Sequence, residues 1–163
     1  MIAVAEMPPS TARRVRTGNH LAFDLADDVF ALDAARVRDV AGPVEILPVP
    51  GKPAFFRGIT NFWGSVVPIM DLRLKLDRPP AGDEREYTIM VVVAHGLDMG
   101  LLVDRVGGLF HVSDHRVREL PAFGLLARPD LAHGVVPCGD RSAILLDLDR
   151  LLHPDEWTSV PQP

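Results

Sequence analysis

Histidine and cysteine are the residue types in this sequence most suited to metal binding or nucleophilic chemistry. His111 and His115 lie four residues apart, the spacing that puts two zinc ligands on one helix face. The local pattern instead predicts a strand for His111 and a helix for His115, and no glutamate follows the first histidine as in metalloproteases. Cys138 could act as a nucleophile beside His133, although a buried structural thiol is the simpler reading. A small β-barrel enzyme or metal-binding protein therefore stays open as an alternative.

Carboxylates could supply acid and base catalysis, but their positions favour another role. Most fall at the ends of expected strands or in turns, where they solvate apolar segments: Asp24, Asp27, Asp28, Asp71, Asp104, Asp147 and Asp149. The clustered glycines neither have the P-loop spacing nor open a helix: Gly96, Gly100, Gly107 and Gly108. We therefore expect no catalytic residue, no cofactor and no bound metal, and an interaction protein is the main hypothesis.

Length, charge and apolar runs limit the remaining function classes. A chain of 163 residues, 47% of them hydrophobic, is expected to form one domain with a packed core. Its net charge of −5 would repel a polyphosphate backbone, so nucleic acid is not an expected partner. The longest apolar run, Ile89–Ala94, is far shorter than the roughly 20 residues of a membrane-spanning helix, and the N-terminus lacks a secretory signal. With a single cysteine, a cytoplasmic protein without direct membrane insertion is predicted.

Short apolar runs separated by turn residues follow from His20 onward, a pattern typical of an all-β sandwich or barrel. The clearest strand is expected over Val66–Leu76, where apolar and charged residues alternate. A strand over Arg57–Phe62 would join it through Trp63-Gly64-Ser65, because glycine accepts a positive φ. The first hairpin is thus predicted around Gly64.

A second hairpin is predicted over Tyr87–Ala94 and Leu97–Val103, with His95-Gly96 as its turn. Both faces of these strands are apolar, which indicates strands buried on both sides, as where two small barrels share a core. Gly107-Gly108 is expected to break the next strand.

The last third of the chain is predicted to add a helix, a hairpin and a closing helix. Ser113 has the position of an N-cap, and the helix it begins would reach about Leu120. A third hairpin joins Gly134–Cys138 to Ser142–Leu146. Apolar residues at helical spacing then predict a closing helix over about 147–153.

The segment 57–73 has features of an edge that meets a partner rather than of a core. It combines two turn glycines, large aromatic residues and a proline inside a strand. Pro68 removes a donor from the strand ladder, which is tolerated mainly on edge strands or at bulges. Phe62 and Trp63 could each be ordinary core residues instead.

This segment resembles the signature of CheW-type coupling domains. That signature carries Arg-Gly, then Asn-Leu-Arg-Gly, then Val-Pro-Ile followed by Asp-Leu-Arg. The matching residues are Arg57-Gly58, Asn61-Phe62-Trp63-Gly64, Val67-Pro68-Ile69 and Asp71-Leu72-Arg73. Similarity to the family extends roughly from His20 to Leu152.

The resemblance implies an all-β fold of two SH3-like five-stranded β-barrel subdomains that share a hydrophobic core, with short helices including one at the C-terminus. The implied division is a flexible tail over 1–18, a single domain over 19–154 and a tail over 155–163. The first barrel would take roughly 36–80, and the second roughly 19–35 plus 86–147. The closing helix would span about 147–153.

The resemblance also implies a non-catalytic adaptor. Family members bind the cytoplasmic tip of a chemoreceptor along a groove between the subdomains, and bind the regulatory domain of a CheA-type histidine kinase through the barrel ends. The residues at or supporting the receptor-facing surface would be Asp39, Val40, Arg57, Asn61, Phe62, Trp63 and Gly64. Such a protein would be recruited to chemoreceptor arrays in the cytoplasm.

One departure from the signature affects the expected partners. Trp63 replaces the usual arginine, which in the family can pair with an acidic residue at the place of Asp39. Trp63 could bury against a receptor helix as a hot spot, or the protein could be an accessory form that binds receptor but not kinase. A fragment of a larger kinase with the same fold is a third possibility, and the positions of Met1 and of the closing helix favour a separate adaptor.

Overall fold

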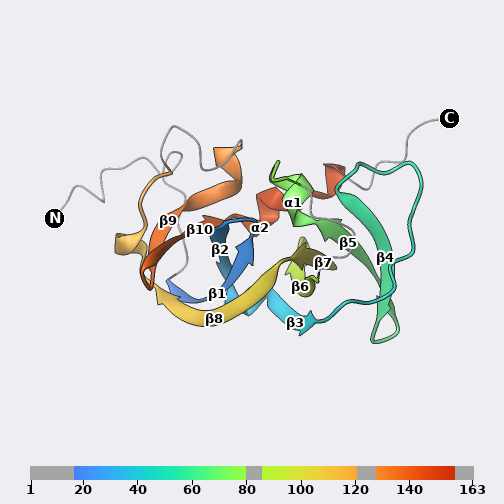
Figure 1. The fold of residues 1–163 in the computed structure, drawn as a ribbon, viewed down its shortest axis with the longest axis horizontal. Helices are drawn as coiled ribbons and strands as arrows, with labels where there is room; N and C mark the ends of the chain where they lie inside the picture. Colours follow the sequence, from blue (N-terminus) through green and yellow to red (C-terminus); the bar gives the residue numbers. More distant parts are fainter. Residues whose placement is uncertain (1–16, 80–85, 121–127, 157–163) are drawn as a thin grey trace.

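The computed structural model describes residues 17–79, 86–120 and 128–156, which fold into two five-stranded sheets placed side by side along the longest axis (Figure 1). We call them the terminal sheet, of order β8-β1-β2-β10-β9, and the central sheet, of order β3-β6-β7-β5-β4. Each contains one parallel pair, β2 with β10 and β5 with β7, and the remaining neighbours are antiparallel.

The strands and helices are short, as expected for small barrels. The terminal sheet consists of β1 Gly18–Leu25, β2 Asp28–Asp33, β8 Arg105–Val112, β9 Ala132–Cys138 and β10 Arg141–Leu146. The central sheet consists of β3 Val37–Ala41, β4 Phe56–Phe62, β5 Ser65–Asp71, β6 Thr88–Ala94 and β7 Leu97–Val103. The helices are η1 Ala34–Arg36, α1 Leu72–Lys75, η2 Asp114–Arg116, η3 Pro129–Leu131, α2 Leu148–Leu151 and η4 Pro154–Glu156. Within the described ranges, none of these helices is long and apolar enough to cross a membrane.

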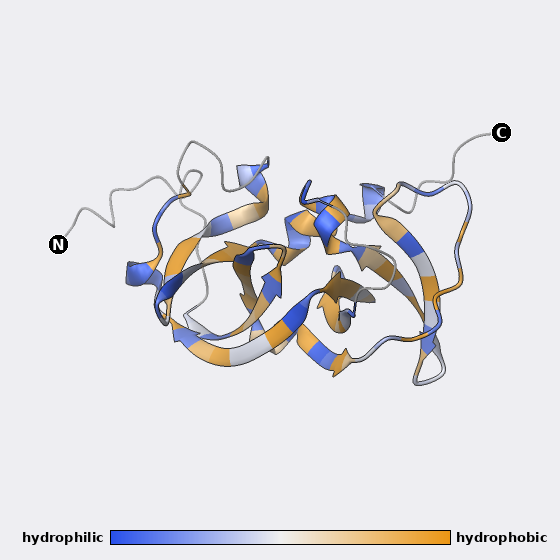
Figure 2. Cartoon of the chain, viewed as in Figure 1, coloured by the Kyte–Doolittle hydropathy of each residue, from blue (hydrophilic) through white to orange (hydrophobic). Residues whose placement is uncertain are grey.

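A large apolar core lies between the two sheets. Phe23 and Phe30 of the terminal sheet pack in one buried cluster with Met90, Met99 and Leu101 of the central sheet. The opposite sheet faces enclose two smaller clusters, one in each barrel. The inner strands are therefore buried on both faces, whereas hydrophobic and hydrophilic residues mix along β3 and β8 (Figure 2). The expected pair of barrels around a shared core is confirmed.

Each sheet is closed toward a barrel by an isolated bridge opposite a glycine. Leu47 pairs with Ile59 beside Gly58, and Arg118 pairs with Val135 beside Gly134. A Cβ at Gly58 would lie 2.2 Å from the Leu47 carbonyl oxygen, and one at Gly134 would lie 2.3 Å from that of Arg118. Both glycines also have a positive φ, of 145° and 153°. The close approach of the closing segment therefore requires glycine at both places.

The strand pairing corrects the expected division of the chain. The sequence predicts β6 and β7 in the second barrel with the later strands, but they pair with β3 and β5 in the central sheet. The chain passes from the terminal to the central sheet between β2 and β3, and returns to the terminal sheet between β7 and β8. The domain limits also shift slightly, since Gly18 already belongs to β1 and Asp155 and Glu156 belong to η4. Residues 1–16 and 157–163 lie outside the described residues.

The expected strand over 66–76 is wrong beyond Asp71, where β5 gives way to helix α1. The Asp71 carboxylate accepts hydrogen bonds from the backbone N–H groups of Arg73 and Leu74, at 3.0 and 3.4 Å, as an N-cap does. The turn of helix buries Lys75, which a strand would have exposed. Its Nζ pairs with Glu156 and lies over the Phe55 ring.

Two further expectations, for the glycines of β8 and for the helix after Ser113, need correction. β8 runs through Gly107 and Gly108 without a break, and the glycines coincide with a shift of register between β1 and β8, the mark of a β-bulge. The helix expected after Ser113 is only the single 3-10 turn η2, and the Ser113 side chain makes no capping bond. The closing helix over 147–153 is present as α2, which is capped by Asp147.

Candidate functional site

The β4–β5 hairpin presents the aromatic part of the signature at a two-residue turn. Phe62 pairs with Ser65, so Trp63 and Gly64 form the turn, with φ values of 54° and 80°. Two positive φ values define the type I′ geometry that suits a twisted hairpin. The Asn61 side-chain oxygen accepts a hydrogen bond from the Gly64 backbone N–H at 3.1 Å. Asn61 and Gly64 thus support the turn, and they hold Trp63 at its tip.

The two aromatic residues of the hairpin have different surroundings. Phe62 is half-buried and packs against the apolar interior of the central barrel. Trp63 is 59% exposed, and its ring lies 5.4 Å from that of Phe62, centroid to centroid. Val66, the next outward residue on β5, is 65% exposed. Phe62 therefore fixes the hairpin to the barrel interior, while Trp63 and Val66 form an exposed apolar tip.

Pro68 marks the point where β5 separates from β7. The parallel pairing of the two strands covers Ile69–Asp71 on β5, and among the described residues it does not extend to Pro68. β5 is thus an interior strand in its second half and an edge in its first half. The expectation that Pro68 lies at an edge holds locally, and the missing N–H falls where no ladder bond to β7 is formed.

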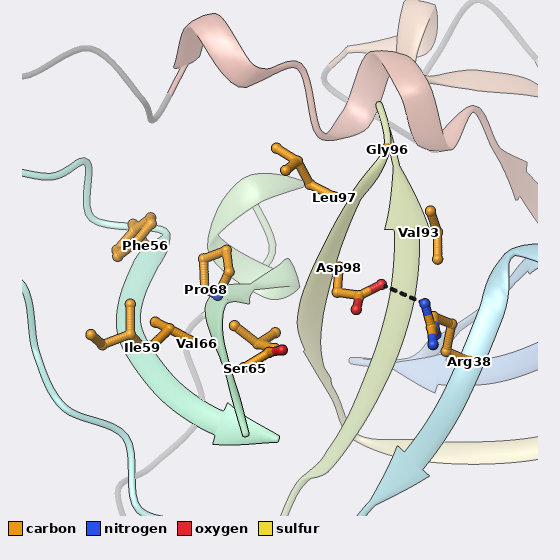
Figure 3. A pocket seen from close by; sticks show the side chains of 11 residues that line it. Arg38, Phe56, Ile59, Ser65, Val66, Pro68, Val93, Gly96, Leu97 and Asp98 are labelled. Atoms are coloured by element: carbon orange, nitrogen blue, oxygen red, sulfur yellow. Dashed lines mark hydrogen bonds and ion pairs between the residues drawn. The ribbon is translucent and has the colours of Figure 1, made fainter. Parts of the chain in front are cut away.

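The separation of β5 from β7 leaves an open groove of about 420 Å³ in the central sheet (Figure 3). The β4–β5 hairpin forms one wall, and the β6–β7 hairpin with β3 forms the other. The lining residues are mainly apolar: Phe56, Ile59, Ser65, Val66, Val67 and Pro68 on the first wall, and Arg38, Val93, Gly96, Leu97 and Asp98 on the second. Arg38 and Asp98 pair across the second wall at 3.3 Å. The groove therefore offers a hydrophobic floor with a charged pair at one side.

Polar contacts fix the second wall to the elements behind it. The His95 ring nitrogen Nε2 lies 2.7 Å from the Asp149 backbone carbonyl oxygen, an acceptor. Arg36 donates to the Val93 carbonyl oxygen at 2.8 Å and to the Asp149 carboxylate at 2.6 Å. The hydrogen bond from Arg36 lowers the pKa of Asp149 below its usual value. The β6–β7 turn is thus held against α2 rather than swinging freely.

The other predicted site residues lie away from the hairpin tip. Arg57 pairs with Asp71 at 3.3 Å, at the opposite end of the hairpin, where it supports the start of α1. Asp39 and Val40 lie on β3, at the other edge of the strand order from β4. The Asp39 carboxylate accepts the Val40 N–H at 2.8 Å, and Val40 is 42% exposed. The structure therefore brings residues 61–64 together at the hairpin tip. Arg57, Asp39 and Val40 lie elsewhere on the central barrel.

Several groove residues were not singled out from the sequence. The sequence predicts Leu97 only as the first residue of a strand, yet it is 44% exposed at the rim of the groove. Ile59 and Val66 lay inside the segment that resembled the family but were not assigned a contact. Leu97 begins an apolar run that predicts a buried strand, so no local pattern marks it as exposed, and the groove itself depends on a pairing between distant strands.

The alternative metal or cysteine site gains no support from the geometry. In the described part of the chain, no three histidine, cysteine, aspartate or glutamate residues gather as a metal site would need. His111 is exposed on β8 and His115 is exposed in η2. Cys138 is partly buried and packs against the interior of the terminal barrel, as expected of a structural thiol.

Comparisons with known proteins agree with this architecture. The family model described as CheW-like domain matches residues 19–156. The chain is 28% identical over 141 residues to the chemotaxis protein CheW of Klebsiella aerogenes, covering 86% of this chain and 84% of that protein. It is 29% identical over 136 residues to a probable chemotaxis protein CheW of Rhizobium etli, covering 83% and 88%. The crystal structure of the scaffolding protein TtCheW from Thermoanaerobacter tengcongensis superposes with a TM-score of 0.76 at 25% identity, covering 85% of this chain and 94% of that one.

Proposed function

The chain belongs to the CheW-like domain family, and from this premise we propose that it binds the cytoplasmic tip of a chemoreceptor through the β4–β5 hairpin and the adjoining groove. Proteins of this family are non-catalytic adaptors, and this chain is a coupling adaptor of a chemotaxis system rather than an enzyme. We also propose that each partner binds a separate surface of the chain, and that the chain acts in the cytoplasm at receptor arrays.

The observation that carries the proposal is the exposed apolar tip beside an apolar groove. Trp63 and Val66 are each more than half exposed, and Leu97 borders the groove on its other wall. Exposed apolar residues grouped next to a hollow are typical of a protein interaction site. A groove lined by aliphatic side chains suits the apolar face of a helix, which inserts side chains spaced three or four residues apart. The tip would then cover one side of that helix.

The charges around the groove would set the orientation of the receptor helix. The Arg38 and Asp98 pair lies at one side, and both groups are partly accessible. Rim charges of this kind contribute more to partner choice and association rate than to affinity. The apolar contacts would supply most of the binding free energy, with Trp63 as the central anchor.

We further propose that the regulatory domain of a CheA-type kinase binds at a barrel end, as the family resemblance implies. An accessory adaptor that holds receptor without kinase is the alternative form of the same proposal. Trp63 at the hairpin tip bears on this choice, because an aromatic residue there offers no charge to a partner carboxylate.

Binding of the purified chain to two partners tests the proposal. A receptor cytoplasmic fragment and a kinase regulatory domain are titrated separately by isothermal calorimetry. Saturable binding of the receptor fragment supports the proposal, and binding of the kinase domain decides between the coupling and accessory forms. Failure to bind either partner, with circular dichroism showing an intact β fold, would contradict it.

A further inference from the structure

Arg73, the last residue of the signature segment, reaches from the central barrel to the junction between the barrels. Its Nε donates to Asp104 Oδ1 at 3.0 Å, and its Nη2 donates to Asp104 Oδ2 at 2.5 Å. The two side chains are only 15% and 20% exposed. The bond to Asp104 raises the pKa of Arg73. A two-pronged contact of this kind fixes direction as well as distance, because both planar groups must align.

Asp104 is the residue at which the chain passes from β7 of the central sheet to β8 of the terminal sheet. Its Oδ2 also accepts the Ala26 backbone N–H at 3.0 Å, and its own N–H donates to the Asp24 carbonyl oxygen at 3.0 Å. Ala26 lies in the β1–β2 turn with a φ of 55°, a conformation that a residue with a Cβ rarely adopts. One carboxylate therefore holds the α1 arginine, the interbarrel crossing and a turn of the terminal sheet together.

A second arginine repeats the connection a few residues later. Arg78 Nη2 pairs with Asp28 Oδ2 at 2.8 Å, so the segment after α1 is joined to the start of β2. Its guanidinium also lies over the ring of Phe30, 5.6 Å from the centroid, at the border of the shared core. The Arg78 backbone N–H donates to the Arg73 carbonyl oxygen at 2.7 Å, so the backbone joins the two arginines directly.

Apolar burial and these polar contacts constrain the two barrels differently. The shared core holds the sheets together, but apolar attraction is non-directional and depends mainly on area. The arginine contacts join specific residues on the two sides of the junction, and their hydrogen bonds have defined directions. We propose that Arg73 and Asp104, supported by Arg78 and Asp28, are positioning residues that fix the angle between the barrels and so the spacing of the partner surfaces. The consequence for partner surfaces rests on the proposed function, while the angle itself does not.

The interbarrel distance in the free protein tests this proposal. Cysteines for spin labels replace Val40 on β3 and Leu109 on β8, both exposed, in a chain that carries Cys138→Ser. Pulsed electron resonance then gives the distribution of distances between the labels. No partner is present, so the result is independent of whether a receptor or kinase binds.

Arg73→Gln and Asp104→Asn are each expected to shift the maximum of this distribution or to broaden it, with the β spectrum retained. Arg105→Gln is the matched control, because Arg105 pairs with Asp24 at 2.7 Å within the terminal sheet and its loss should leave the distribution unchanged. If either variant fails to fold, Arg73→Lys, which keeps the charge but loses the two-pronged contact, provides the same comparison. Distributions that superimpose on that of the unchanged chain, even with a lowered melting temperature, would overturn the proposal.

Discussion

Replacing Trp63 by asparagine should separate receptor binding from folding. Trp63 occupies the first turn position with a φ of 54°. Asparagine followed by glycine is the preferred sequence for a type I′ turn, so Trp63→Asn relieves strain in the left-handed region, where most side chains cost about 1–2 kcal/mol. The lost ring contact with Phe62, worth about 0.5–1.5 kcal/mol, offsets this gain. The free energy of unfolding should therefore change by no more than about 1 kcal/mol.

The effect on binding should be much larger. A tryptophan can bury up to about 250 Å², and 59% of Trp63 remains exposed in the free chain, which leaves roughly 150 Å² for a partner to cover. At about 25 cal/mol per Å² this area corresponds to at most about 4 kcal/mol, and central anchors lose about 2 kcal/mol or more when truncated. The dissociation constant for the receptor fragment should rise by roughly 30- to 700-fold.

Calorimetric titration of the receptor fragment into both proteins measures this change, and urea unfolding measures stability. Leu109→Asn is the control, because Leu109 is similarly exposed, at 64%, but lies on β8 of the terminal sheet. Its affinity should match that of the unchanged chain. A Trp63→Asn protein that is folded and binds receptor within threefold of the unchanged chain would refute the assignment of Trp63 as the anchor.

Three other perturbations concern Lys75, Gly58 and Asp149. Burial lowers the pKa of Lys75 from 10.5 to about 8. Between these pH values the unfolded chain holds a proton that the folded chain has released, so the free energy of unfolding should rise with pH. Urea unfolding should show this rise in the unchanged chain and not in Lys75→Met. Gly58→Ala should destabilise the fold by about 3 kcal/mol or more, because its Cβ would meet a carbonyl oxygen at 2.2 Å, while Gly108→Ala, with open space around it, should change stability by less than about 1 kcal/mol in thermal unfolding. The hydrogen bond from Arg36 holds the pKa of Asp149 below 3.8 in the folded chain. The stability that this carboxylate contributes is therefore present above pH 3.8 and is lost as the pH falls through its folded-state pKa. An acid titration followed by circular dichroism should show a smaller loss of stability below pH 3.8 in Arg36→Gln.

The local part of the fold was predictable from sequence because hairpins are specified by neighbouring residues. The turn at Trp63-Gly64 and that at His95-Gly96 both use positive φ values and were expected from their glycines. Burial of both faces of β6 and β7 was also expected from their continuous apolar runs. Where local patterns are ambiguous the prediction failed, since alternating leucines and charges after Asp71 fit a strand and a helical turn equally well.

The partnering of distant strands was not predictable, and the groove depends on it. No local sequence pattern predicts that β5 pairs with β7 in parallel from Ile69 onward. This pairing places β6 and β7 in the central sheet and leaves the groove beside Pro68. The hairpin turn at Trp63 was predictable, and the structure shows Trp63 exposed at its tip, while nothing in the sequence alone located Leu97 on the facing wall. Arg73 belongs to the signature segment, but its bond to Asp104 joins residues 31 positions apart, which no local pattern predicts.

The proposed receptor surface can be mapped residue by residue on the folded chain. The isotope-labelled protein is titrated with an unlabelled receptor cytoplasmic fragment, and backbone and indole N–H resonances are followed by nuclear magnetic resonance. The Trp63 indole, Val66 and Leu97 should show the largest changes, and Leu109 on the terminal sheet should be unaffected. Changes centred on the terminal sheet, with the hairpin and groove resonances unmoved at saturation, would contradict the proposed receptor surface.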